Sequence, residues 1–531
     1  MLMLNEQGLK NRAAWEEKGY LLPQFDRAAM RENTRRAPAW VHFGAGNIFR
    51  ALQCMGAQRL LNAGWMDTGI IAVEGFDYEI VEKGYRSHDD YTLLVTLRAD
   101  GSVEKTVVGS IAESCVLDSG SAAEYNHLRQ IFSSPSLQLA SFTITEKGYS
   151  LTDSRGETLR EAAEDMRRGP EKPQSYLGKV ASLLYARYRA GAAPVALVSM
   201  DNCSRNGEKL HAAVLAFARA WGDAGFLDYV QDESRVSFPW TMIDKITPRP
   251  DASVEALLQA DGLQGLEPAV TARGTYIAPF VNAEESEYLV IEDRFPNGRP
   301  PLEKAGFILT DRETVNKVER MKVCTCLNPL HTALAIFGCL LGYTRISDEM
   351  KDADLTRLIR RAGYAEGLPV VTNPGVIAPR AFIDTVVNVR LPNPFMPDTP
   401  QRIATDTSQK LAIRFGETIR AYLAADGLDA GSLQAIPMVL AGWLRYLMGV
   451  DDTGREFTLS ADPLLEEVRP FVAGLRLGDR AEPERLLPLL AQERIFGVDL
   501  ARAGLAEKIC GLFNRMIAAP GAVRHTLKEI E

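Results

Sequence analysis

Three polar side chains that lie within ten residues of one another carry groups that could act in proton transfer: Lys322, Asn328 and His331. An ammonium group can deliver a proton, while an amide and an imidazole can hold the oxygen atoms of a substrate. Asn328 and His331 are three residues apart, so in a helix they share one face. The sequence therefore predicts an acid–base cluster that is built on a helix.

Whether Lys322 reaches this face depends on how the helix begins. Lys322 lies six residues before Asn328, and at ~100° per residue a regular helix would turn the lysine well away. Pro329 lacks an N–H, and its ring clashes with the carbonyl group four residues earlier. We therefore predict an irregular turn at 324–328 that absorbs one residue and swings Lys322 back. The alternative is a regular helix with Lys322 in solvent and His331 in the core.

A distant segment has the pattern of a turn that binds a dinucleotide. The apolar strand Trp40–Phe43 runs into Gly-Ala-Gly-Asn-Ile-Phe-Arg, and a helix is predicted over 48–62. Glycines after a first strand let the backbone approach a pyrophosphate, and the helix N-terminus favours its negative charge. Phe49 stands where the third glycine of the full pattern would be, so a tight turn without a ligand is the alternative. The residues expected at the cofactor are Gly44, Gly46, Asn47, Phe49 and Arg50.

Two acids follow the second predicted strand, Thr68–Val73. Glu74 or Asp77 could accept hydrogen bonds from the adenosine ribose, and a carboxylate there would repel a 2′-phosphate. This favours NAD over NADP. Glu74 lies about 30 residues after Gly44 rather than the usual ~20, and a solvated strand end is the alternative for either acid.

Two further polar residues follow predicted strands. Asn202 comes after the buried strand Val195–Met200, where open α/β sheets bind ligands, although capping of the next helix is the alternative. Asp244 lies between apolar residues and would be costly to bury unless it were paired. Lys322 is its natural partner, and a local pair with Lys245 is the alternative.

Later in the chain, Arg390 lies in a Pro-rich loop and Lys410 follows it. A guanidinium group can grip a carboxylate or a hydroxyl pair, and a surface salt bridge is the alternative. Cys324 and Cys326 beside His331 invite a zinc interpretation, but on a helix the two sulfurs diverge by ~200°. We therefore expect packing cysteines and no metal ligand set.

Alternating strands and helices over the first 300 residues predict a doubly wound, mostly parallel sheet. Asp100-Gly101 predicts a hairpin between strands at 91–97 and 103–111. From about residue 312 helical periodicity dominates. We expect a polar lead-in over 1–36, a Rossmann-like α/β dinucleotide-binding domain over 37–305, and an all-α C-terminal domain over 306–531.

Composition and charge exclude other classes of protein. The 531 residues carry a net charge of −9, which argues against a nucleic-acid binder. Seven cysteines form no disulfide framework, so we expect a cytoplasmic protein. We expect no membrane association, because the N-terminus lacks the apolar core of a signal peptide and no apolar run reaches ~18 residues.

Together these segments resemble the mannitol dehydrogenase family, the polyol-specific long-chain dehydrogenases and reductases. The resemblance implies a Rossmann-like N-terminal domain, a helical C-terminal domain, a cleft between them, and NAD(H) dependence without a metal. It implies that Lys322 is the catalytic acid/base, that Asn202 and Asn328 hold the reacting oxygen, and that Asp244 lies beside the lysine. The segments that carry the likeness are Gly44–Arg50, Thr143–Tyr149, Ser199–Asn202, Met242–Pro248, Val290–Pro300, Lys322–His331, Leu341–Tyr343 and Arg390–Pro394.

The resemblance also implies that His331 and Arg390 bind the substrate. The segments look closest to the uronate-reducing members, and Arg390 or Lys410 could engage a uronate carboxylate. We therefore expect a fructuronate reductase, with tagaturonate reductase and mannitol 2-dehydrogenase as alternatives and a non-catalytic NADH sensor as a different class. We expect a sugar acid or polyol as the partner, and a monomer or small homo-oligomer.

Overall fold

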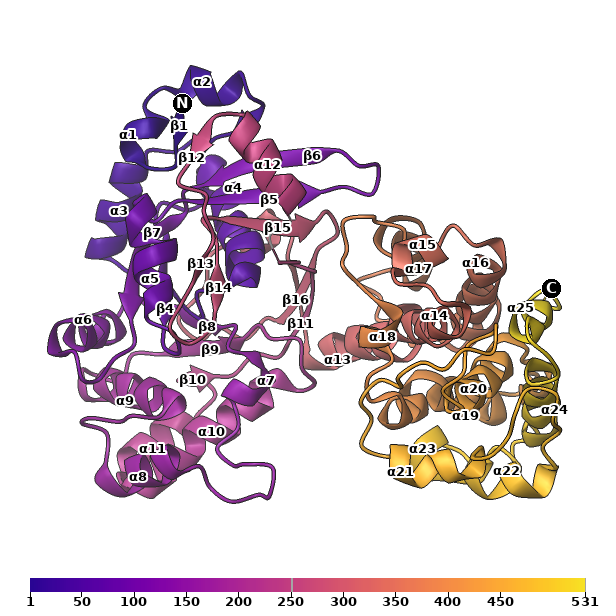
Figure 1. The fold of residues 1–531 in the computed structure, drawn as a ribbon. Helices are drawn as coiled ribbons and strands as arrows, with labels where there is room; N and C mark the ends of the chain where they lie inside the picture. The colour runs from indigo at the N-terminus through magenta and orange to yellow at the C-terminus, as the bar shows by residue number, and fades with distance from the viewer. Residues whose placement is uncertain (250–251, 531) are drawn as a thin grey trace. The chain divides into compact units, whose positions relative to one another are not determined.

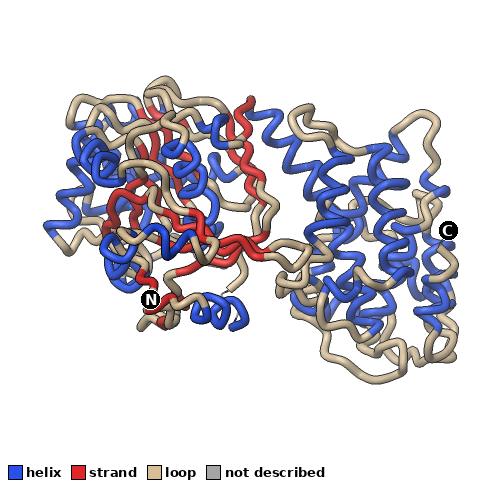
Figure 2. Tube along the Cα trace, turned by 90° about the horizontal axis from the view of Figure 1, so that it is seen from above, coloured by secondary structure: helices blue, strands red, loops and turns tan. Residues whose placement is uncertain are grey.

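The computed structural model describes residues 1–249 and 252–530, and the chain divides into two compact units. Unit 1 comprises residues 1–98 and 102–316, and unit 2 comprises residues 99–101 and 317–531. Within the described residues, strands β1 to β17 all belong to unit 1, whereas unit 2 is helical (Figures 1 and 2). The α/β and all-α character expected for the two parts is thus confirmed, while the boundaries after 36 and 305 stay predictions.

The centre of unit 1 is a six-stranded parallel sheet (Figure 1). Its order is β7-β4-β3-β8-β9-β10. Strand β3, which comes first in the chain, lies in the middle, and the order reverses between β3 and β8. This is the strand order of dinucleotide-binding doubly wound sheets, and it confirms the predicted fold class. The strands are β3 (Trp40–Phe43), β4 (Ile70–Glu74), β7 (Ile111–Val116), β8 (Leu139–Phe142), β9 (Val195–Ser199) and β10 (Val236–Ser237).

Apolar cores cover both faces of this sheet, which is why its central strands are mostly apolar. One core packs the sheet against α6 (Ala122–Ser133), α9 (Tyr176–Arg189) and α10 (Asn206–Trp221). The other packs it against α4 (Cys54–Asn62) and two of the smaller sheets. The helix that follows β3 is predicted over 48–62, and the structure forms it as a π-helical turn, Phe49–Gln53, followed by α4.

The smaller sheets complete unit 1. The predicted hairpin is present as antiparallel β5 (Thr92–Leu97) and β6 (Val103–Val108). Its second strand is shorter than predicted, because the N–H of Ile70 bonds to the carbonyl of Ser110 (3.0 Å) and draws the chain into the main sheet as β7. Two groups of further strands lie beside these: β15 (Phe280–Glu284) and β2 (Tyr20–Leu21), then β11 (Thr241–Asp244), β16 (Tyr288–Glu292) and β17 (Ile308–Thr310).

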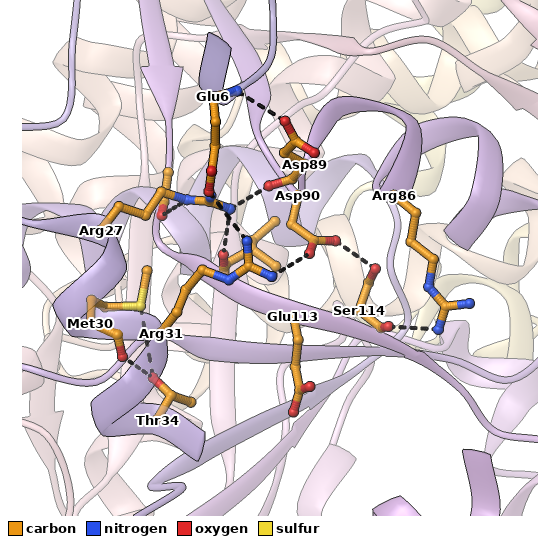
Figure 3. Close-up of polar contacts among 12 residues, drawn as sticks. Glu6, Arg27, Met30, Arg31, Thr34, Arg86, Asp89, Asp90, Glu113 and Ser114 are labelled. Carbon is orange, nitrogen blue, oxygen red and sulfur yellow. Dashed lines mark hydrogen bonds and ion pairs between the residues drawn. The ribbon is translucent and has the colours of Figure 1, made fainter. Parts of the chain in front are cut away.

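The N-terminal lead-in is an integral layer of unit 1. Helix α3 (Arg27–Arg36) buries Arg27, whose guanidinium pairs with Glu6 (2.8 Å). It also donates to the carbonyl of Asp89 and to the carbonyls of Gly109 and Ile111 (3.2 Å each). Figure 3 shows this network, in which Arg31 also reaches Asp90. A buried guanidinium with four acceptors ties residues 1–36 to the start of β7.

Unit 2 is built around helix α14 (Asn328–Leu341), which is almost fully buried. A stretch of 30 residues, Arg312–Leu341, is long and apolar enough to span a membrane. However, 83% of its most apolar 18-residue portion is buried inside the structure. A helix at the centre of a packed bundle has the same property. The longer helices around it are α16 (Ala353–Arg360), α19 (Glu417–Ala424), α20 (Ala435–Tyr446), α22 (Pro483–Leu490) and α24 (Ala506–Met516).

One carboxylate in this bundle is buried without compensation. Glu349, the last residue of α15 (Ile346–Glu349), has no exposed surface, and within the described residues neither carboxylate oxygen has a hydrogen-bond partner. A Cβ added to Gly338 would lie 2.2 Å from Glu349 Oε1, so the acid packs directly against α14. Burial raises the pKa of Glu349 from 4.5 to about 9. The acid is therefore protonated in the folded chain at neutral pH.

This pKa predicts a specific dependence of stability on pH. Between pH 4.5 and about 9 the unfolded chain releases a proton that the folded chain keeps, so Glu349 makes the chain progressively less stable as the pH rises. Glu349→Gln removes this penalty. We expect the variant to exceed the wild type in Tm by several degrees near pH ~8 and by less near pH ~5. Calorimetry at both pH values measures the gap, and a gap that does not grow with pH would contradict the assigned protonation.

Candidate functional site

The turn after β3 is packed against the protein at Gly44 and open at Gly46. Gly44 has φ +100°, and a Cβ added there would lie 2.1 Å from the carbonyl oxygen of Thr143. The N–H of Ala45 donates to Glu74 Oε2 at 3.0 Å. At Gly46 an added Cβ would meet no atom within 4 Å. This gives the backbone at Gly46 the open approach that a pyrophosphate requires.

Glu74 and Asp77 stabilise the loops beside this turn. The carboxylate of Glu74, at the end of β4, accepts the N–H of Ala45 and also those of Phe76 (2.7 Å) and Asp77 (3.1 Å). Asp77 is buried and accepts the hydroxyl of Thr271. Both acids lie at the carboxyl end of β4, where we predicted them, and their contact with a ribose stays a prediction.

Two residues expected at the cofactor, Phe49 and Arg50, have buried side chains. Phe49 has no exposed surface, and its ring stacks on His42 with centroids 4.2 Å apart. Arg50 is 1% exposed and donates to the carbonyl of Ala278 and to Asn47 Oδ1, both at 2.7 Å. Both side chains fill the core, so a contact of these two residues with a cofactor would be made by their backbone, and that contact stays a prediction. They support the turn from below, and Asn47 remains half-exposed on it.

Asn202 is exposed on a loop that begins at the carboxyl end of β9. The adjacent Asp201 accepts the N–H groups of Ile144 (2.8 Å) and Thr145 (3.0 Å). Asn206 donates to the carbonyl of Asp201 at 3.0 Å. These bonds hold the loop to the neighbouring strand end, so Asn202 is presented on a fixed backbone at the edge where doubly wound sheets bind ligands.

Asp244 is the last residue of β11 and is 6% exposed. The ammonium group of Lys245 pairs with Glu287 (3.0 Å) and donates to the carbonyl of Glu284 (2.9 Å). Side chains alternate along a strand, so Asp244 and Lys245 point to opposite faces. The alternative of a pair between these two neighbours therefore loses its support.

In unit 2, Lys322 begins a π-helical segment, Lys322–Cys326. The N–H of Leu327 bonds to the carbonyl of Lys322 (3.1 Å), five residues earlier, and Leu327 has the non-helical φ of −129°. Helix α14 then starts at Asn328 with Pro329 in its first turn. The predicted irregular turn is confirmed. Lys322 is only 4% exposed, so the alternative of a solvent-exposed lysine is excluded.

The cysteines in this segment are packing residues, as expected. Cys324 and Cys326 are buried as free thiols. Burial raises the pKa of Cys324 to about 11 and that of Cys326 to about 12. Both thiols are therefore protonated at neutral pH in the folded chain.

His331 lies among positive charges. Its Nε2 is 3.5 Å from Asp398 Oδ2, too far for a hydrogen bond, and this buried atom has no hydrogen-bond partner within the described residues. Burial lowers the pKa of His331 well below its ordinary value, and Asp398 opposes that shift. Three guanidinium groups lower this pKa further. We call this group the His331 cluster: His331, Asp398, Arg390, Arg402 and Arg414.

Three separate segments supply the arginines of the His331 cluster. Arg390 ends the π-helical segment Val386–Arg390 and is 5% exposed. Arg402 pairs with Asp398 four residues before it, and Arg414 donates to the hydroxyl of Thr332 on α14. The cluster contains one acid and three guanidinium groups, so as a whole it is positively charged and can hold an anion.

Lys410 lies beside the His331 cluster rather than at its centre. Its ammonium group donates to the carbonyl of Thr405. Burial lowers the pKa of Lys410, and the charge of Arg414 lowers it further. Arg390 and Lys410 were predicted from the sequence, whereas Asp398, Arg402 and Arg414 were missed. The i, i+4 spacing of Asp398 and Arg402 after the Pro-rich loop was the available signal.

Two models of one protein family match most of this chain. A model of the mannitol dehydrogenase Rossmann domain matches residues 38–304, and a model of the mannitol dehydrogenase C-terminal domain matches residues 314–516. This chain belongs to the mannitol dehydrogenase family. The D-mannonate oxidoreductase of Thermotoga maritima is 52% identical to it over 537 residues, which cover 100% of this chain and 99% of that protein.

Two solved structures of family members share the fold. A D-sorbitol dehydrogenase in substrate-free form matches with a TM-score of 0.80 and 25% identity, covering 98% of this chain and 100% of that one. The mannitol 2-dehydrogenase of Pseudomonas fluorescens, in a ternary complex with NAD and D-mannitol, matches with a TM-score of 0.69 and 28% identity. That match covers 99% of each chain.

Proposed function

We propose that this chain is an NAD-dependent oxidoreductase that interconverts a keto-uronate and a sugar acid, and that it is a fructuronate reductase, or D-mannonate oxidoreductase. The observation that carries the proposal is the full-length identity of 52% to the Thermotoga maritima enzyme of that activity. The proposed partner is the small sugar acid. The proposed location is the cytoplasm, supported by seven cysteines that are all free thiols, and the proposed state is a monomer or small homo-oligomer.

The turn after β3 fits a dinucleotide. Its backbone at Gly46 is open, and a helix begins directly after it, which favours a diphosphate. The carboxylate of Glu74 supports NAD over NADP, since it would repel a 2′-phosphate. When bound, NADH supplies the hydride that reduces the keto carbon. Gly44, Gly46 and Asn47 hold the cofactor, while Phe49 and Arg50 keep the turn in shape.

Lys322 moves the proton in the proposed mechanism. Its ammonium group donates a proton to the keto oxygen during reduction and takes it back during oxidation. Asn202 and Asn328 donate hydrogen bonds to the same oxygen as it gains negative charge. Asp244 orients the lysine.

The His331 cluster supports a uronate as the substrate. A uronate carries a carboxylate that a neutral polyol or ketose lacks, and three guanidinium groups can bind it through charge-assisted hydrogen bonds. The neutral imidazole of His331 can bind a hydroxyl group with the Nε2 atom that has no hydrogen-bond partner within the described chain. Arg390 and Lys410 keep their proposed roles, and Arg402 and Arg414 join them.

Steady-state rates of NADH oxidation with fructuronate, tagaturonate and fructose test the proposal. We expect the highest kcat/KM for fructuronate. A clear preference for tagaturonate would assign a tagaturonate reductase, and a clear preference for fructose would assign a mannitol 2-dehydrogenase type of activity. NADH binding without turnover of any of the three would overturn the proposal in favour of a sensor.

Two glycine substitutions separate cofactor binding from folding. Gly46→Ala adds a methyl group that meets no protein atom but fills the space the pyrophosphate needs. We expect its Tm to match the wild type, while its Kd for NADH rises about tenfold or more, equivalent to ~1.4 kcal/mol. Titration of NADH fluorescence measures the Kd.

Gly44→Ala is the matched control. Its φ of +100° and the nearby Thr143 carbonyl make any side chain strained there. We expect a loss of stability of about 1–3 kcal/mol in urea denaturation. Wild-type NADH affinity in Gly46→Ala would show that the pyrophosphate does not bind at this turn.

A further inference from the structure

A second group of chemically active side chains lies at the edge of the main sheet in unit 1, remote in sequence from every residue proposed for catalysis. Glu113 and Cys115 of β7 and His127 of α6 have potential ligand atoms that all lie within 4.8 Å of one another. The closest pair is His127 Nε2 and Glu113 Oε1 at 3.0 Å. A carboxylate, a thiol and an imidazole are the three side-chain types that bind zinc and related ions.

A bulge in β7 places these residues on one face. Ile70 pairs with Ile111, but Ile71 pairs with Glu113, so Ala112 is the extra residue. A bulge of one residue moves all later side chains to the opposite face of the sheet. Glu113 and Cys115 therefore lie with Ile71 and Val73 on the face that α6 covers.

Ser114 shows the alternation of β7 directly. Its hydroxyl donates to Asp90 (2.6 Å) and so joins the Arg27 network on the other side of the strand. In Figure 3 the Glu113 side chain points away from that network. Glu113 is thus available to a ligand on the α6 side, where His127 is its ion-pair partner.

Burial and charge at this position suit a cation. Cys115 is 2% exposed, whereas the side chains of Glu113 and His127 are 35% and 39% exposed. The site therefore has a buried thiol on one side and two solvent-accessible ligands on the other. Glu124, one turn before His127, accepts the N–H of Val116 (3.1 Å) and pairs with Arg86 (2.7 Å). Glu113 and Glu124 together outweigh the single charge of Arg86, and the negative local field favours a divalent ion.

We propose that Glu113, Cys115 and His127 bind one divalent transition-metal ion of the zinc class, with water as the fourth ligand. Tetrahedral zinc, with bonds of roughly 2.0–2.3 Å, needs ligand atoms roughly 3.3–3.8 Å apart, which small rotations of exposed side chains supply. On binding, the thiol of Cys115 and any imidazolium of His127 release their protons to water. The ion links edge strand β7 to α6 and stabilises unit 1, and the proposal does not depend on the proposed function.

Titration with CoCl2 tests this site, because a cobalt–thiolate bond absorbs in the near ultraviolet and the visible bands report tetrahedral geometry. We expect one Co²⁺ per chain with a thiolate band, and displacement by ZnCl2. Cys115→Ala should lose the thiolate band, while Cys510→Ala, which removes another buried thiol, should keep it. A wild type without this band, or a band that persists in Cys115→Ala, would overturn the proposal.

His127→Gln keeps the test decisive if Cys115→Ala does not fold. His127 is partly exposed, so its substitution leaves the core intact. We expect at least ~100-fold weaker Co²⁺ binding, since mutation of a residue that only hydrogen-bonds to a metal ligand already lowers metal affinity about 10–100-fold. ZnCl2 should raise the Tm of the wild type but not of His127→Gln, and kcat should be the same in both. Equal Tm shifts in the two proteins would show that any bound metal lies elsewhere.

Discussion

Lys322→Ala is expected to lower kcat for fructuronate reduction by about 10²–10⁴-fold while leaving the Kd for NADH unchanged. The ammonium group is the proposed donor of the proton that the product alkoxide must gain. It is 4% exposed at the start of a π-helical turn, where bulk water has little access. Stopped-flow measurement of NADH oxidation gives kcat, and fluorescence titration gives the Kd.

Two further lysine variants separate the proton from the charge. Lys322→Arg keeps a positive charge but holds its proton too firmly to deliver it, so we expect almost the same loss of kcat. Lys351→Ala changes a lysine whose side chain is 73% exposed in the same unit, and it should behave as wild type. Turnover close to wild type in Lys322→Ala would remove the lysine from the mechanism.

Arg402→Gln is expected to raise KM for fructuronate by about 10–100-fold with a smaller change in kcat. Its guanidinium pairs with Asp398 and adds positive charge at His331, and a hydrogen bond to a charged group contributes about 1.5–3 kcal/mol. The side chain is 62% exposed, so the substitution should leave the fold intact. Steady-state kinetics with fructuronate and fructose, side by side, measure the effect.

The comparison with fructose gives this prediction its specificity. Fructose lacks the carboxylate. Its turnover, which we expect to be weaker than that of fructuronate, should therefore change little in Arg402→Gln and in Arg390→Gln. Arg360→Gln is the control, since that arginine donates to Asn388 and lies outside the His331 cluster. If KM for both sugars rises by the same factor, the cluster does not recognise a carboxylate.

The sequence predicted those parts of the fold that depend on local chemistry. Strand β3 is mostly apolar because both of its faces are buried, and the structure forms it over Trp40–Phe43 as predicted. Pro329 predicted the irregular turn before α14 because the proline ring excludes a regular helix there. In both cases the cause lies within a few residues of the effect.

Features that depend on distant parts of the chain were not predictable in this way. Phe49 and Arg50 follow a glycine turn, but only packing determines that they face the core. The bulge at Ala112 reverses the faces of β7, and no local pattern in the strand announces it. The His331 cluster draws on α14 and three other segments, so its arginines look like ordinary surface residues in the sequence. The π-helical segment that ends at Arg390 has no sequence signature either.

A crystal structure with NADH and D-mannonate bound tests the central claim most directly, because the claim concerns one proton donor at one oxygen. We predict that Lys322 Nζ lies about 3 Å from the hydroxyl oxygen of the carbon that exchanges hydride, within hydrogen-bonding reach. We also predict the sugar carboxylate among the guanidinium groups of the His331 cluster. A Lys322 Nζ directed away from that oxygen, with another side chain or water in its place, would contradict the proposed mechanism.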